Sequence, residues 1–145
     1  MIGLLQRTSR ASVSIAGETV GEIERGLLVL VAVHRDDEER DIARLAERIL
    51  GYRVFPDAEG RMNRSILDIS GGLLLVPQFT LTADTKKGTR ASFTKGANPE
   101  KASACFDGLV DACRHRLEKV ETGRFGADMQ VSLVNDGPVT FWLES

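Results

Sequence analysis

The sequence contains little cysteine and no long hydrophobic run. Only two cysteines, Cys105 and Cys113, occur among its 145 residues. They lie eight positions apart in an expected helix, about 12 Å along its axis, which is too far for a disulfide. We therefore interpret both as small buried apolar residues. The longest apolar run covers residues 27–33, whereas a membrane-spanning helix needs about 20 apolar residues. No signal peptide is evident either, so we expect a cytoplasmic protein that does not bind membranes.

Metal ligands and cofactor motifs are also scarce. The two histidines, His34 and His115, lie on different expected elements, with no cysteine or carboxylate at ligand spacing. The chain has no Walker A sequence and no G-x-G-x-x-G. We therefore expect neither a metal nor another cofactor. The formal net charge is −2, so the broad basic face of a duplex binder is lacking and we expect no DNA partner. A small basic patch that holds one end of a nucleic acid remains compatible with this charge.

The composition is that of an ordinary globular protein. Hydrophobic residues make up 42% of the chain and charged residues 28%, enough for a core that needs no disulfide or metal. A chain of this length fits one domain, and no linker or repeat divides it. We predict that residues 1–145 form a single domain.

Hydrophobic periodicity predicts several strands and two main helices. Alternating or continuous apolar residues indicate strands over 2–7, 11–15, 19–23, 27–33, 73–76, 129–133 and 139–143, and residues 52–55 are also strand-like. One helix carries apolar residues from Ile42 to Ile49, with Asp36 or Asp37 as its N-cap. The second begins at Asn98 with Pro99 in its first turn, after a long polar loop over 82–97. The predicted class is α+β, with a mostly antiparallel sheet or partial barrel.

Two short segments are candidates for a functional site. Gln78-Phe79-Thr80 follows a buried strand that Pro77 ends, and strand ends are common positions for sites. The alternative is that these polar side chains only bind nearby backbone groups. In residues 135–140, the Asp-Gly pair favours a tight turn between two strands. Pro138 fits such a turn poorly, because it restricts Gly137 and has no N–H.

The sequence as a whole resembles the bacterial D-aminoacyl-tRNA deacylases. The similarity runs from MIGLLQR through RASV, LGYRVF, DAEGRMN, PQFTLTADT and SFTKGA to TGRFGADMQVSLVNDGPVTFWLES. The resemblance implies a homodimeric, metal-free enzyme that binds the 3′ end of aminoacyl-tRNA. Such an enzyme hydrolyses the ester between a D-amino acid and the terminal ribose, and glycyl-tRNA is accepted in some contexts.

The resemblance also assigns catalytic residues. Gln78, Phe79 and Thr80 match the active-site strand end, where backbone N–H groups can stabilise the oxyanion of the tetrahedral intermediate. Thr80 as a nucleophile is a second possibility, but no histidine or lysine beside it in the sequence would activate the hydroxyl. The family often has serine where this chain has Pro77.

A second group of residues is assigned to substrate selection by the same resemblance. Gly137-Pro138, joined by a cis bond, is expected to reach into the partner subunit's site, where its main chain excludes L side chains. Arg7 matches an arginine that braces this segment. Phe125 and Met129 match residues that line the pocket.

Two other interpretations remain open from the sequence alone. The protein could hold the 3′ end of tRNA without hydrolysing it. It could also be a structural dimer in which residues 135–138 form an ordinary hairpin turn.

The basic residues of the predicted long loop lead to a first prediction. Four cations cluster there although the chain is acidic overall: Lys86, Lys87, Arg90 and Lys95. With roughly two to four phosphate contacts, the logarithm of tRNA affinity should fall with the logarithm of salt concentration with a slope of about −1.4 to −2.8. Titration of tRNA at several salt concentrations measures this slope. An affinity that does not change with salt would indicate a loop that is merely solvated.

Overall fold

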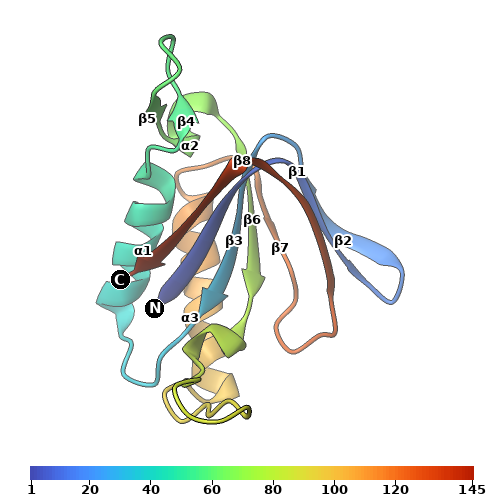
Figure 1. The fold of residues 1–145 in the computed structure, drawn as a ribbon, viewed down its shortest axis with the longest axis vertical. Helices are drawn as coiled ribbons and strands as arrows, with labels where there is room; N and C mark the ends of the chain where they lie inside the picture. The colour runs from blue at the N-terminus through green and yellow to red at the C-terminus, as the bar shows by residue number, and fades with distance from the viewer.

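The computed structural model describes residues 1–145 and contains one mixed sheet with two long helices on one face (Figure 1). Five of the six strands run in the order β2-β1-β3-β6-β7. The sixth, β8, also pairs with β1. The elements are β1 (Ile2–Ile15), β2 (Glu18–Ile23), β3 (Gly26–Ala32), α1 (Glu39–Gly51), β4 (Phe55–Pro56), β5 (Met62–Arg64), α2 (Ile66–Ile69), β6 (Gly72–Pro77), the 3-10 turn η1 (Phe79–Thr82), α3 (Pro99–Arg114), β7 (Val120–Thr122) and β8 (Gln130–Glu144).

Strand β1 organises the sheet. Its first half pairs antiparallel with β3 and its second half with β2, while β8 runs antiparallel along its other side. Strands β3, β6 and β7 are parallel to one another. Parallel neighbours need long crossover connections, and helices α1 and α3 lie in those connections. The predicted α+β class with a mostly antiparallel, partly closed sheet and two main helices is confirmed.

The largest difference from the sequence prediction concerns the long strands. Residues 2–7 and 11–15 belong to one strand, β1, and residues 129–133 and 139–143 belong to one strand, β8. The predicted turn over residues 135–138 is therefore wrong. Between Gln6 and Thr8 on β1, the facing residues on β8 step from Thr140 to Asn135. The extra β8 residues form a bulge inside a continuous ladder.

The start of α1 also differs from the prediction. Neither Asp36 nor Asp37 is the N-cap; that position is Glu38, whose N–H donates to Asp41 Oδ2 at 2.9 Å. This hydrogen bond holds the pKa of Asp41 below its ordinary value. The Asp37 carboxylate instead accepts a 2.7 Å hydrogen bond from the Met1 amino group. Asp37 and Glu38 are adjacent in sequence, yet Asp37 binds the N-terminus and Glu38 caps the helix. The local capping pattern does not distinguish these two roles.

The predicted start of α3 is confirmed. Asn98 is its N-cap and accepts a hydrogen bond from the Lys101 N–H at 2.9 Å, and Pro99 occupies the first turn. The segment before it is the expected long loop, apart from η1 at its beginning. Helix α2 and strands β5 and β7 were not predicted. Each has only three or four residues, too few for periodicity to reveal.

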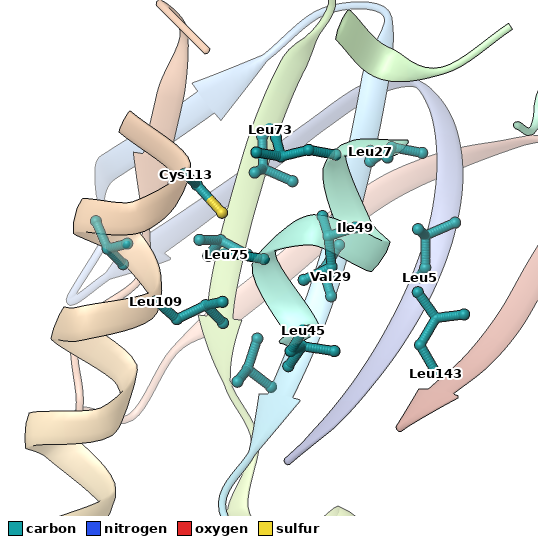
Figure 2. Packing of buried hydrophobic residues seen from close by; sticks show 14 of the residues in the cluster. Leu5, Leu27, Val29, Leu45, Ile49, Leu73, Leu75, Leu109, Cys113 and Leu143 are labelled. Carbon is teal, nitrogen blue, oxygen red and sulfur yellow. The ribbon is translucent and has the colours of Figure 1, made fainter. Parts of the chain in front are cut away.

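The core lies between the sheet and helices α1 and α3 (Figure 2). Leu45 and Ile49 of α1 and Leu109 of α3 point toward the strands and are fully buried. Both cysteines are free and buried, as expected. Burial raises the pKa of the Cys113 thiol to about 12, so this residue packs as an uncharged apolar group. None of the helices is long and apolar enough to cross a membrane.

Two glycines allow β3 and β6 to begin side by side. Gly26 pairs with Gly72 in the parallel ladder, and a Cβ on Gly26 would lie 1.8 Å from the carbonyl oxygen of Gly72. The Gly72 oxygen is a main-chain atom of β6, and the main chain of β3 fixes where the Cβ would lie. The sheet can therefore accept a side chain here only by separating the two strands.

This contact predicts that Gly26→Ala destabilises the protein strongly, by about 3 kcal/mol or more, because backbone atoms have to move. Gly51→Ala is the matched control, since a Cβ there would meet nothing within 4 Å. The control should change the free energy of unfolding by less than about 1 kcal/mol. Urea unfolding of both variants measures the difference. Equal stability of the two would show that the close approach is not a constraint.

Candidate active site

A largely apolar cavity of about 490 Å³ opens at the carboxyl end of β6. One wall is the end of that strand together with the first residues of η1. A second wall is the start of α3, and the third is the segment that leads from β7 into β8. The lining residues are Val76, Pro77, Gln78, Phe79, Ala97, Pro99, Ala102, Phe125, Gly126, Ala127, Met129 and Val131.

The structure therefore brings together four of the residues singled out from the sequence. Gln78 and Phe79 lie on one side of the cavity, and Phe125 and Met129 lie on another. Although these pairs are almost 50 positions apart in sequence, the parallel β6–β7 pairing places them side by side. Thr80 follows on η1 and is exposed, outside the lining.

The chain turns sharply where β6 ends. The Gln78 N–H donates to the carbonyl oxygen of Val31 at 2.7 Å, which holds the turn against the end of β3. The first hydrogen bond of η1 is donated by the Leu81 N–H to the Gln78 carbonyl oxygen, at 3.2 Å. The N–H groups of Phe79 and Thr80 precede that bond, and the first N–H groups of a helical turn have no partner within it. Two main-chain donors without a partner in the turn thus lie at and next to Phe79, a residue of the cavity lining.

The surroundings of the Thr80 hydroxyl do not activate it. Its oxygen accepts a hydrogen bond from the Gln78 side-chain amide at 2.6 Å, and this is its one hydrogen bond. An amide N–H is a donor and cannot take up a proton from the hydroxyl. A nucleophilic hydroxyl needs an adjacent base, and the described contacts provide none.

Gly137-Pro138 does not reach the cavity of its own chain. The bulge lies beside Arg7 of β1, which pairs with Leu27 near the start of β3. The cavity lies beside Val31, at the other end of the same strand. Four residues along a strand correspond to roughly 13 Å. The sequence-predicted site residues therefore form two separate groups on one subunit.

Arg7 binds the backbone of the bulge and that of a second segment. Its Nε donates to the carbonyl oxygen of Asp136 at 2.8 Å, and its Nη1 donates to the carbonyl oxygen of Val54 at 2.6 Å. The Arg7 side chain is only 13% exposed. It therefore links the residue before Gly137 to the segment that follows α1.

Asn135 closes the bulge and was missed by the sequence interpretation. Its Oδ1 accepts a hydrogen bond from the Val139 N–H at 2.7 Å, and its Nδ2 donates to the Thr140 hydroxyl at 2.8 Å. The enclosed Gly137-Pro138 peptide bond is cis. Gly137 has φ +142°, and a Cβ there would lie 2.7 Å from Val139 Cγ2. The known tendency of asparagine to bind nearby backbone groups was the available signal.

Comparisons with known proteins agree along the whole chain. The family model described as D-Tyr-tRNA(Tyr) deacylase matches residues 4–144. A protein of Alkalilimnicola ehrlichii named D-aminoacyl-tRNA deacylase is 62% identical, over 100% of this chain and 97% of that protein. An Escherichia coli protein of the same name is 58% identical, over 99% of each chain.

Solved structures show the same fold. One described as "c-Myc DNA Unwinding Element Binding Protein" has a TM-score of 0.95 and 36% identity, and the match covers 100% of this chain and 99% of that one. Another, described as "Structural Analysis of a probable eukaryotic D-amino acid tRNA deacylase", has a TM-score of 0.83 at 17% identity, over 99% of this chain and 98% of the other. At that identity the likeness concerns the fold alone.

The contacts of Asn135 predict that Asn135→Ala destabilises the protein. Two hydrogen bonds are lost and the Val139 N–H loses its acceptor. The free energy of unfolding should therefore fall by about 1–2 kcal/mol. Asn63→Ala is the control, because Asn63 lies on an exposed strand and accepts from the Arg53 side chain. That change should stay within about 0.5 kcal/mol. Chemical denaturation compares the two, and an effect no larger than that of the control would contradict the role of Asn135.

Proposed function

This chain belongs to the D-Tyr-tRNA(Tyr) deacylase family, and we propose that its cavity uses main-chain groups to hydrolyse the ester of D-aminoacyl-tRNA. The names of its close relatives give the reaction, which releases free D-amino acid and tRNA. The observation that supports the mechanism is the pair of N–H groups of Phe79 and Thr80, which η1 leaves without a partner beside the cavity residues Gln78 and Phe79.

These donors suit the charge that develops during ester hydrolysis. Water attacks the ester carbonyl carbon, and the negative charge moves to the carbonyl oxygen. The N–H groups of Phe79 and Thr80 donate to that oxyanion. The bond to the ribose oxygen then breaks, and the proton given up by water is transferred to this leaving oxygen. The neighbouring 2′-hydroxyl of the substrate assists the water, so the protein needs no side-chain base.

Substrate selection is assigned to Gly137-Pro138 of the partner subunit. Within one subunit this segment lies at the far end of β3 from the cavity, so it can act on a cavity only in a homodimer. Arg7 and Asn135 hold it from both sides, and Gly137 presents bare main chain. An L side chain would point into that main chain, whereas a D side chain would point away. Glycine has no side chain, so glycyl-tRNA also passes this filter.

The roles of the remaining residues follow from their positions. Phe125 and Met129 form the apolar wall that receives the substrate. Gln78 orients the Thr80 hydroxyl and, through its own N–H, anchors the turn on Val31. Pro77 carries no hydroxyl, so the mechanism assigns it only a place in the cavity wall.

The central test compares D- and L-tyrosyl-tRNA as substrates. We expect multiple turnovers that release free D-tyrosine at substoichiometric protein, with the L-substrate left intact. Thr80→Ala should lower kcat by less than roughly 10²-fold, because it removes a hydroxyl and keeps the N–H. Gly137→Ala should reduce D-activity with little gain of L-activity. Binding of the 3′ end without release would instead indicate a non-catalytic binding module, and loss of all hydrolysis in Thr80→Ala would make Thr80 the nucleophile.

A complementation experiment tests whether the site is shared between subunits. Gly137→Val changes the selecting segment, and Met129→Trp fills the cavity; each variant alone should have little activity. In a co-expressed mixture, heterodimers contain one intact cavity facing one intact segment. Activity should then return to about a quarter of the wild-type value, because half of the dimers are mixed and each has one good site. A mixture as inactive as its components would show that each subunit acts with its own segment.

A further inference from the structure

Two exposed aromatic rings lie together beside the cavity. The rings of Phe79 and Phe93 have centroids 5.2 Å apart and planes inclined at 55°. Phe79 is 61% exposed and Phe93 is 43% exposed, although rings of this size are usually buried. Phe79 also lines the cavity. The pair therefore presents an exposed aromatic surface next to the cavity.

The local backbone fixes Phe93 against η1. Two parts of the loop form an antiparallel bridge, in which Asp84 and Ser92 exchange two backbone hydrogen bonds, at 2.8 and 3.1 Å. Directly after this bridge, the Gly96 N–H donates to the Phe93 carbonyl oxygen at 3.1 Å. A Cβ on Gly96 would lie 2.8 Å from the Thr82 hydroxyl oxygen, so the returning loop packs closely on η1. The aromatic pair is thus held in place by two segments.

The residues enclosed by this bridge carry a concentrated positive charge. Asp84 is the one acidic residue between Asp68 and Glu100, and it pairs with Lys95 at 3.7 Å. The Lys86 N–H, followed by the charges of nearby lysines, holds the pKa of Asp84 below its ordinary value. Lys86, Lys87 and Arg90 are exposed, and none of them forms an ion pair. Three cations therefore remain unneutralised in a protein of net charge −2.

Exposed aromatic rings beside unpaired cations are the combination that binds single-stranded nucleic acid. Bases stack on the rings, and the backbone phosphates contact the cations. The aminoacylated nucleoside alone can occupy the cavity, so the nucleotides before it have to leave past the opening. We propose that Phe79, Phe93, Lys86, Lys87 and Arg90, here called the rim surface, bind these preceding single-stranded nucleotides of the tRNA. The proposal rests on the proposed function, because it takes the cavity as the site of the terminal nucleoside.

The rim surface would give the enzyme a preference for tRNA over smaller esters. An aminoacyl-adenosine occupies the cavity and has no preceding nucleotide, so it gains nothing from this surface. Binding energy from the preceding nucleotides is therefore available only to tRNA and to RNA strands with the same 3′ end. Duplex RNA fits less well, because its bases are paired and cannot stack on the rings.

The experiment compares D-tyrosyl-tRNA with D-tyrosyl-adenosine as substrates. Lys86→Gln/Lys87→Gln should lower kcat/KM for the tRNA by roughly 10-fold at 0.1 M salt and make the salt slope shallower by about 1.4. Hydrolysis of the adenosine ester should not change. The matched control, Arg114→Gln/Arg116→Gln, removes the same charge from two exposed residues, one at the C-terminal end of α3 and one just after it, and should leave both substrates unaffected.

Substitutions of Phe93 separate stacking from packing. Phe93→Leu keeps an apolar side chain and removes the ring, so kcat/KM for the tRNA should fall about 5- to 10-fold with the salt slope unchanged. Phe93→Trp should retain the wild-type value. If Phe93 only supports the loop, leucine should serve as well as phenylalanine, or both substrates should be affected equally. Either result would overturn the proposal.

A binding measurement keeps this test independent of hydrolysis. A fluorescent single-stranded RNA hexamer ending in CCA is titrated with each variant, and anisotropy reports its affinity. Weaker binding by Lys86→Gln/Lys87→Gln and Phe93→Leu than by the control supports the rim surface. Equal binding by all variants refutes it, even if the wild-type protein hydrolyses both esters. Conversely, a wild-type protein that binds the hexamer and hydrolyses neither ester would refute the proposed function alone.

Discussion

The pairing of β1 with β8 is the interaction on which the rest of the structure depends. It runs nearly the full length of both strands and brings the two ends of the chain together (Figure 1). Because β1 also pairs with β2 and β3, a bend in β1 closes the sheet partway toward a barrel. The bulge at Gly137-Pro138 exists only because β8 continues its ladder on both sides of it. Arg7 on β1 and Asn135 on β8 then hold this segment in one conformation.

The second consequence of this sheet is the separation of the two groups of site residues. Parallel strands place the cavity at the carboxyl end of β6, whereas the antiparallel β1–β8 ladder places the bulge at the opposite end of β3. One chain with this geometry cannot combine its cavity with its own Gly137-Pro138 segment. The proposed homodimer would combine them, because one two-fold rotation would place each segment on the other subunit's cavity.

The candidate chemistry depends on backbone more than on side chains. The proposed oxyanion donors are N–H groups at the start of η1, and the proposed chiral filter is the main chain around Gly137. Backbone positions are set by the sheet hydrogen bonds, so they are rigid and cost little reorganisation during the reaction. Two side chains hold that backbone: Arg7 donates to two carbonyl oxygens, and Asn135 accepts from one N–H. The basic and aromatic rim surface adds recognition of the part of the tRNA that the cavity cannot contain.

Much of this protein was determined by the sequence alone. Local patterns were sufficient for the α+β class, for the apolar stripes of α1 and α3 and for the Asn98-Pro99 start of α3, because helix periodicity and capping act within a few residues. The motifs around Phe79 and Gly137 also predicted the two segments that the proposed site combines. Only the tertiary structure decided that residues 130–144 form one strand instead of a hairpin, since a bulge is stabilised by its partner strand, which the local signals of Asn135 and Pro138 do not identify. The same holds for Asp37, which binds Met1 instead of capping α1, and for Phe93, whose exposure beside Phe79 depends on how a 16-residue loop folds back on η1. Contacts between residues far apart in sequence depend on the whole fold, and local residue preferences do not specify them.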